Sequence, residues 1–141
     1  MRVLGIDLGE RRVGVAVSDP TGSIAQPLPT LRRRAGKRMP LAILQGLAAE
    51  YEVRGIVVGL PLAPSGRDTE WTRQVREAAS DLEERSGVPV HLVDERFTSK
   101  AAERAVRGIG LPKKKREEKG RVDAAAAVLI LQSWLDRRAR S

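Results

Sequence analysis

The sequence has no cysteine, a single histidine and few aromatic residues, which make up 3% of the chain. Without cysteine there can be no disulfide, no thiolate metal site and no cysteine nucleophile. One histidine, His91, cannot build a histidine-rich zinc site or a conventional catalytic triad. Any bound metal must therefore take oxygen ligands, which suit hard cations such as Mg²⁺ or Mn²⁺.

The sequence also lacks a long hydrophobic run. No stretch approaches the roughly 20 apolar residues of a membrane-spanning helix, and strand-like sequence begins too early for a secretory signal. The chain has 141 residues, of which 41% are hydrophobic, and this is enough for the core of one domain. We therefore expect one domain over residues 1–141, in a cytoplasmic protein without a membrane partner.

Positive charge is abundant. The 26 Lys and Arg residues outnumber the 18 Asp and Glu residues, which gives a net charge of +8 and a pI near 10.7. Arginine binds phosphate oxygens bidentately, and a basic domain attracts nucleic acid through counterion release, although net charge also serves solubility. Because aromatic residues are scarce, we expect contacts with the nucleic-acid backbone rather than with stacked bases.

Alternating apolar residues predict an antiparallel meander at the start of the chain. A strand over residues 3–9 is followed, after a short turn, by a second strand over residues 13–17. Residues 23–31 can return as a third strand. This strand must lie at the edge of the sheet, because Pro27 and Pro29 cannot sit inside one.

The rest of the chain alternates helical and strand-like patterns. We expect helices that begin at Pro40 and Asp68, strands near residues 55–58 and 88–94, a helix capped by Thr98 or Ser99, and a final helix from about residue 121. Helices between strands imply parallel crossovers. The predicted fold is therefore α/β, with a mixed five-stranded sheet in which three antiparallel strands are extended by two parallel strands and helices pack on the sheet.

Three acidic residues could meet at one edge of this sheet. Asp7 and Glu95 would follow strands whose carboxyl ends share that edge, and Gly59 on the strand between them would leave room. Asp123 would lie in the first turn of the final helix. Each acid also has a structural interpretation, as a turn residue, an ion-pair partner or a complement to the helix dipole. Asp94 competes with Glu95 for the site.

Four motifs in this order resemble the YqgF/RuvX family. They span residues 5–16, 57–61, 93–99 and 123–126, so the resemblance covers almost the whole chain. It implies a ribonuclease H-like fold and a Holliday-junction-resolvase-like nuclease, generally assigned to trimming the 5′ end of the pre-16S ribosomal RNA precursor.

The resemblance also implies that Asp7, Glu95 and Asp123 are the catalytic acids. Two Mg²⁺ or Mn²⁺ ions bridged by Asp7 would activate water and stabilise the leaving oxygen of a phosphodiester. The loop after Gly59 lacks an acidic residue often found in the family, so we leave that loop out of the metal ligands. We expect phosphate contacts from the basic residues Arg11, Arg12, Arg96, Lys113, Lys114, Lys115 and Arg116.

Other functions stay open at this stage. One is a resolvase acting on branched DNA, and another is a non-catalytic RNA-binding module in ribosome assembly. A third is an ATP-binding domain of the sugar-kinase and actin-like type, although those proteins close two domains around the nucleotide. A resolvase that cuts two strands symmetrically would need a two-fold dimer, so both a monomer and a homodimer are compatible with the sequence.

Overall fold

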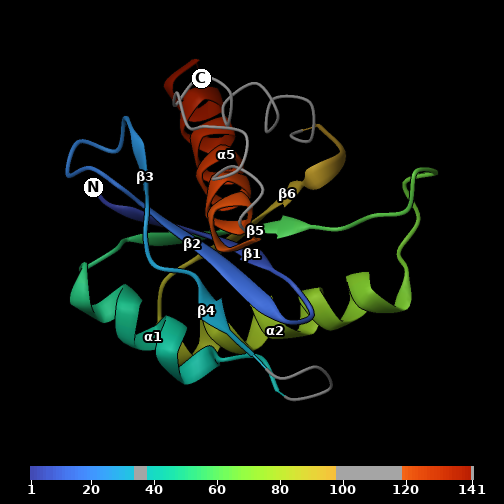
Figure 1. The fold of residues 1–141 in the computed structure, drawn as a ribbon. Helices are drawn as coiled ribbons and strands as arrows, with labels where there is room; N and C mark the ends of the chain where they lie inside the picture. Colours follow the sequence, from blue (N-terminus) through green and yellow to red (C-terminus); the bar gives the residue numbers. More distant parts are fainter. Residues whose placement is uncertain (34–37, 98–118, 141) are drawn as a thin grey trace.

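The computed structural model describes residues 1–33, 38–97 and 119–140, apart from the side chains of residues 97 and 119–123. Its strands form one sheet in the order β3-β2-β1-β5-β6, and β4 also pairs with β2 (Figure 1). The strands are β1 (Val3–Leu8), β2 (Arg12–Ser18), β3 (Ala25–Pro27), β4 (Leu31–Arg32), β5 (Gly55–Leu60) and β6 (Val90–Asp94), and the helices are α1 (Leu41–Glu50), α2 (Glu70–Ser86) and α5 (Lys119–Arg140), with a short 3₁₀ helix η1 (Glu95–Phe97). The predicted α/β fold is confirmed.

The first two strands form the predicted hairpin. They pair antiparallel, with Ile6 opposite Val15. The amide of Gly9 donates to the carbonyl of Arg12 at 2.9 Å, which closes the turn. A Cβ at Gly9 would lie 2.4 Å from that carbonyl oxygen, so the tight turn requires glycine.

The third strand differs from the prediction. Residues 23–31 do not form one edge strand, because β3 and β4 pair with β2 separately. Pro27 still pairs with Ala16 as the last residue of β3, whereas Pro29, which has no amide hydrogen to donate, lies between β3 and β4. Within the described residues the sheet therefore has six strands instead of the expected five.

The parallel half of the sheet follows the prediction. β5 pairs parallel with β1 on one side and with β6 on the other, and all six of its residues are buried. This central position explains why β5 is a continuous apolar run. Because β1, β5 and β6 run in the same direction, their carboxyl ends lie at one edge of the sheet.

Two hydrophobic layers cover the sheet. One face packs against α1 and α2 and the other against α5, and successive strand residues such as Leu4 and Val3 enter opposite layers (Figure 1). α5 comes close to the sheet at Gly5, where a Cβ would lie 2.6 Å from the Cβ of Leu131. None of the helices in the described part of the chain is long and apolar enough to span a membrane.

The start of α2 corrects a second prediction. The N-cap is Thr69 instead of Asp68: the Thr69 hydroxyl accepts a hydrogen bond from the Thr72 amide, and the Thr72 hydroxyl accepts one from the Thr69 amide. The Thr72 hydroxyl also contacts the carbonyl of Pro61. Asp68 pairs with Arg76 at 2.8 Å. The helix ends at Gly87, as predicted, in a left-handed conformation.

Replacing Thr69 with Ala should destabilise the protein by about 1 kcal/mol, because it removes the acceptor for an amide at the helix start. Asp68→Asn is the matched control and should have the smaller effect, since its partner Arg76 is solvent-exposed. Urea unfolding of both variants measures the difference. A larger loss of stability in Asp68→Asn would show that the cap is assigned to the wrong residue.

Candidate functional site

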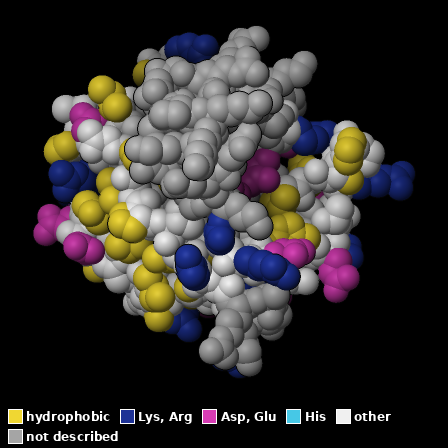
Figure 2. Space-filling view, viewed as in Figure 1, with side chains coloured by type: hydrophobic (Ala, Val, Ile, Leu, Met, Phe, Trp, Pro, Cys, Tyr) yellow, Lys and Arg dark blue, Asp and Glu magenta, His cyan; other side chains and the backbone are white. Residues whose placement is uncertain are grey.

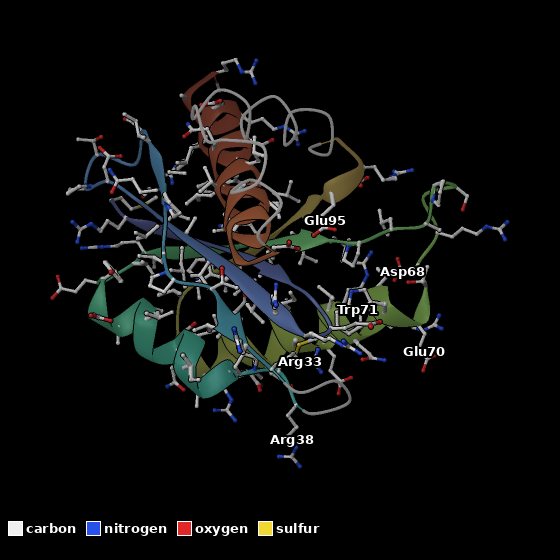
Figure 3. All side chains as sticks on the ribbon, in the orientation of Figure 1. Arg33, Arg38, Asp68, Glu70, Trp71 and Glu95 are labelled. Carbon is white, nitrogen blue, oxygen red and sulfur yellow. The ribbon has the colours of Figure 1, made fainter. Side chains whose placement is uncertain are left out.

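Two acidic residues meet at the carboxyl edge of the parallel strands. Asp7 is the penultimate residue of β1, and Glu95 directly follows β6, beyond the end of β5 (Figure 3). β5 lies between them, and its Gly59 carries no side chain to fill the gap. A Cβ at Gly59 would lie 2.6 Å from Oε1 of Glu95 and 2.5 Å from Cδ1 of Ile130. Glu95 therefore crosses directly over the glycine.

The carboxyl groups of Asp7 and Glu95 form a hydrogen-bonded pair. Burial raises the pKa of Asp7, and the hydrogen bond from Glu95 opposes that rise. Burial, the hydrogen bond to Asp7 and the negative charges of Asp7 and Asp94 raise the pKa of Glu95 to about 8. Two like charges in contact cannot both be desolvated cheaply. The pair therefore favours a shared proton or a nearby cation over two charged carboxylates.

Asp94 points to a different partner. It forms an ion pair with Arg96, with 2.7 Å between Nη2 of Arg96 and Oδ2 of Asp94, and this pair lowers the pKa of Asp94. Nη1 of Arg96 donates to the carbonyl of Pro64 at 3.2 Å. Of the two neighbouring acids, Glu95 thus contacts Asp7, whereas Asp94 and Arg96 tie the end of β6 to the loop after β5.

Sequence reasoning missed the role of this loop. It excluded the loop from the metal ligands because it lacks an acid, but the loop supplies the Pro64 carbonyl that holds Arg96. Gly66 has a φ of +87°, and a Cβ there would lie 3.2 Å from Nη1 of Arg96. The Pro-Ser-Gly turn signal at residues 64–66 could have indicated a fixed loop conformation.

The third predicted acid, Asp123, lies within α5, but its side chain is not among those described. Among the described residues, no group of three or more Asp, Glu, His or Cys side chains is placed to hold a metal. The predicted helix from Thr98 or Ser99 and the basic residues Lys113, Lys114, Lys115 and Arg116 fall outside the described residues. The acids brought together here are therefore Asp7 and Glu95.

The predicted basic residues Arg11 and Arg12 lie at the tip of the β1–β2 hairpin, close in sequence to Asp7. Arg11 is exposed and Arg12 is half-buried. Basic side chains gather on this face around the hairpin (Figure 2). The side chain of Arg33 donates to the Gly9 carbonyl at 3.1 Å and lies over the ring of Trp71 (Figure 3), so it ties the hairpin turn to α2.

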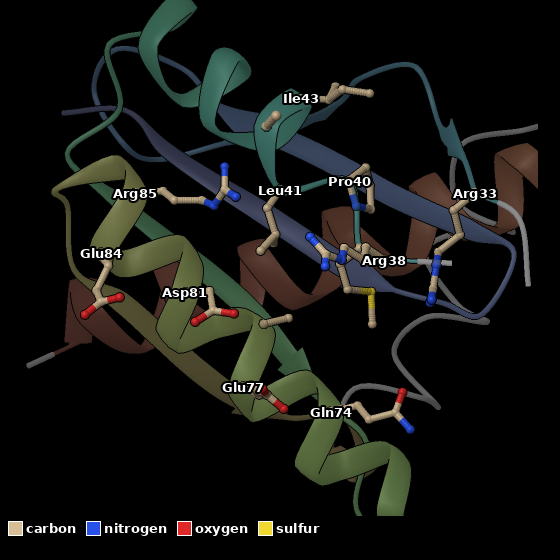
Figure 4. Close-up of a pocket in the computed structure, with 13 residues that line it drawn as sticks. Arg33, Arg38, Pro40, Leu41, Ile43, Gln74, Glu77, Asp81, Glu84 and Arg85 are labelled. Carbon is tan, nitrogen blue, oxygen red and sulfur yellow. The ribbon is translucent and has the colours of Figure 1, made fainter. Parts of the chain in front are cut away.

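A separate groove of about 760 Å³ lies between α1 and α2, which cover the face of the sheet opposite to α5 (Figure 4). Both basic and acidic side chains line it, including Arg38, Arg85, Glu77 and Asp81. It does not include the Asp7–Glu95 pair. His91 also lies away from the pair and stacks on Trp134, with 4.9 Å between ring centroids, in agreement with a structural role.

Replacing Glu95 with Gln should change how the stability of the metal-free protein depends on pH. A carboxyl group with a raised folded-state pKa stabilises the fold while protonated, and this contribution is lost as the pH rises through the folded pKa, here about 8. Glu95→Gln should therefore be more stable than wild type at about pH 9, by roughly 2 kcal/mol with partial solvent screening, and the difference should shrink toward about pH 4.

Urea unfolding in EDTA across this pH range measures the effect. The control Glu77→Gln removes an exposed carboxylate on α2 and should follow the wild-type pH profile. A difference between wild type and Glu95→Gln that does not change with pH would contradict the shared proton.

Replacing Gly59 with Ala should force Glu95 and Ile130 to move, because the new Cβ would lie well inside contact distance of both. Such overpacking costs about 1–3 kcal/mol. Gly46→Ala is the control: nothing lies within 4 Å of its Cβ position, and alanine in a helix is favoured by about 0.5–1 kcal/mol. Unfolding measurements should thus give changes of opposite sign, and similar changes would argue against the close contact at Gly59.

Comparison with known proteins places this chain in a family. The RuvX family model, described as Holliday junction resolvase, matches residues 1–137. A protein of Koribacter versatilis named "Putative pre-16S rRNA nuclease" is 50% identical over 137 residues, which cover 97% of this chain and 88% of that protein. A protein of the same name from Anaeromyxobacter dehalogenans (strain 2CP-1) is 47% identical, over 99% of both chains.

Solved structures agree in fold. Thermus thermophilus RuvC in complex with a Holliday junction substrate has a TM-score of 0.66 at 20% identity, and covers 100% of this chain and 97% of its own. The fowlpox virus Holliday junction resolvase has a TM-score of 0.62 at 12% identity, over 98% of this chain and 99% of its own. The mixed sheet, its helices and these neighbours establish the predicted ribonuclease H-like fold. Together with the family match, they show that the chain belongs to the RuvX family of Holliday-junction-resolvase-like nucleases.

Proposed function

We propose that residues 1–141 form one metal-dependent nuclease domain that hydrolyses phosphodiester bonds at the 5′ end of the pre-16S ribosomal RNA precursor, in the cytoplasm. The observation that carries the proposal is the buried contact between Asp7 and Glu95. Burying two adjoining carboxyl groups is costly, and a fold that only needed stability would gain from apolar side chains there. A site built for a cation accounts for the arrangement.

The donor set suits a hard divalent cation. Both carboxyl groups have raised pKa values, so a cation beside them would replace the proton that they share. We propose Asp7, Glu95 and Asp123 as the ligands. When bound there, Mg²⁺ or Mn²⁺ supplies Lewis-acid chemistry that activates water and stabilises the leaving oxygen of a phosphodiester.

The surrounding residues position the pair and the substrate. Gly59 leaves the space that Glu95 occupies, and the ion pair of Arg96 with Asp94 fixes the backbone on both sides of Glu95. We propose that Arg11 and Arg12 contact phosphates beside the cut, as do the four basic residues 113–116. Arg96 was also expected to bind phosphate, and its contact with Asp94 supports a positioning role.

The substrate proposal rests on the relatives and on composition. Relatives at 43–50% identity are named for pre-16S rRNA cleavage. The net charge of +8 and the few aromatic residues favour binding through the RNA backbone and its shape. The description of the family model favours a second candidate, cleavage of branched DNA, which would require a two-fold dimer for symmetric cuts.

Asp7→Asn and Glu95→Gln should each reduce cleavage roughly 100-fold or more, because each removes a proposed metal ligand. Cleavage of a pre-16S RNA fragment in Mg²⁺ or Mn²⁺ measures this, and EDTA should abolish it. Glu77→Gln, with an exposed carboxylate on α2, should cleave like wild type. Equal activity of Asp7→Asn and wild type would refute the proposed site.

A substrate panel of pre-16S RNA, unstructured single strands and four-way DNA junctions separates the candidates. Preference for the RNA fragment supports the proposal, and preference for junctions supports the resolvase alternative. Salt-dependent RNA binding that survives loss of all three acids, without cleavage in either metal, would identify an RNA-binding module instead.

A further inference from the structure

A second basic surface lies at the opposite edge of the sheet. It is a concavity of about 610 Å³, lined by Arg54, His91, Trp134, Arg137 and Arg138, together with Met1 and the backbone at Gly55 and Pro89. Gly55 begins β5 and Pro89 precedes β6, so this concavity lies at the amino ends of the parallel strands. Among its described lining residues there are three arginines and no Asp or Glu.

The arginines come from separate elements and converge. Arg54 precedes the first residue of β5, whereas Arg137 and Arg138 come from the last turns of α5. The Arg138 guanidinium lies 5.4 Å from the centroid of the Trp134 ring, which also stacks on His91. Nη1 of Arg138 also donates to Sδ of Met1 at 3.7 Å, so these contacts hold the guanidinium at the concavity, and its positive charge can attract an anion.

The ligand chemistry follows from this lining. Arginine clustered in a concavity whose described lining has no acidic side chain attracts phosphate, and Asp94 is within electrostatic reach of Arg137. The Trp134 ring already contacts His91 and Arg138, so it is not arranged to stack a base. We infer that this concavity, which we name the distal basic surface, binds backbone phosphates of a single-stranded RNA segment that flanks the cut.

The separation of the two sites sets a requirement on the substrate. Gly55 in the lining of the distal basic surface and Gly59 beneath Glu95 are four residues apart on β5, which is about 13 Å along the strand. An RNA that contacts both must extend beyond the cleaved bond. The inference rests on the proposed function, because it assigns a second contact to the same RNA.

Binding measurements test the surface independently of cleavage. Fluorescence anisotropy in EDTA, with a labelled single-stranded RNA of about 20 nucleotides, compares wild type with the double variant Arg54→Gln/Arg138→Gln. We expect about tenfold weaker binding, and a salt dependence of log K that is shallower by about 1.4, since each phosphate contact on single strands contributes about 0.7. Arg73→Gln, an exposed arginine on α2, is the control for lost charge and should change neither quantity appreciably.

Two further measurements keep the result interpretable. Thermal melting confirms that the double variant folds, and Arg54→Lys/Arg138→Lys, which retains the charges, should recover most of the salt dependence. Binding by the double variant that equals that of the Arg73→Gln control overturns the inference. Competition by inorganic phosphate at low concentration would identify a small-anion site and also overturns it. Absence of cleavage in Mg²⁺ or Mn²⁺ would instead contradict the proposed function, because the binding test needs neither metal nor catalysis.

Discussion

The burial of two carboxyl groups in contact is the constraint on which the rest of this edge of the molecule depends. Like charges close together in a desolvated position repel each other strongly, so Asp7 and Glu95 need a shared proton or a cation. The hydrophobic layers on both faces of the sheet supply the stability that allows this cost. Apolar packing on both faces of the sheet thus offsets the unfavourable electrostatic energy of the two carboxyl groups at the strand ends.

Keeping that pair together requires space as well as support. β5 separates the strands that carry the two acids, and only glycine at position 59 leaves Glu95 and Ile130 their present positions. The Asp94–Arg96 ion pair and the Pro64 carbonyl then hold the chain next to Glu95. Asp94 and Glu95 are neighbours in the sequence, but their roles differ. Glu95 belongs to the acidic pair, whereas Asp94 holds Arg96 and so fixes the chain beside the pair.

Positive charge is distributed at both ends of the parallel strands. Arg11 and Arg12 lie at the hairpin tip near the acidic pair, and the distal basic surface lies at the amino ends. In contrast, the groove between α1 and α2 carries both signs of charge. This distribution fits a polyanion that extends along the sheet, on the side of α5, because a backbone of phosphates interacts with charge over many nucleotides.

The sequence by itself determined most of the secondary structure and the strand directions. Alternation in residues 3–17 predicts the hairpin, and helices between strands predict the parallel half, because both patterns depend on local periodicity. The resemblance to the family also indicated that Asp7 and Glu95 are catalytic acids. Only the tertiary structure decided that Glu95 rather than Asp94 contacts Asp7, that Thr69 caps α2, and that residues 23–31 form two short strands instead of one. Those outcomes depend on which groups the folded chain brings within hydrogen-bonding distance, and spacing along the sequence does not encode that distance.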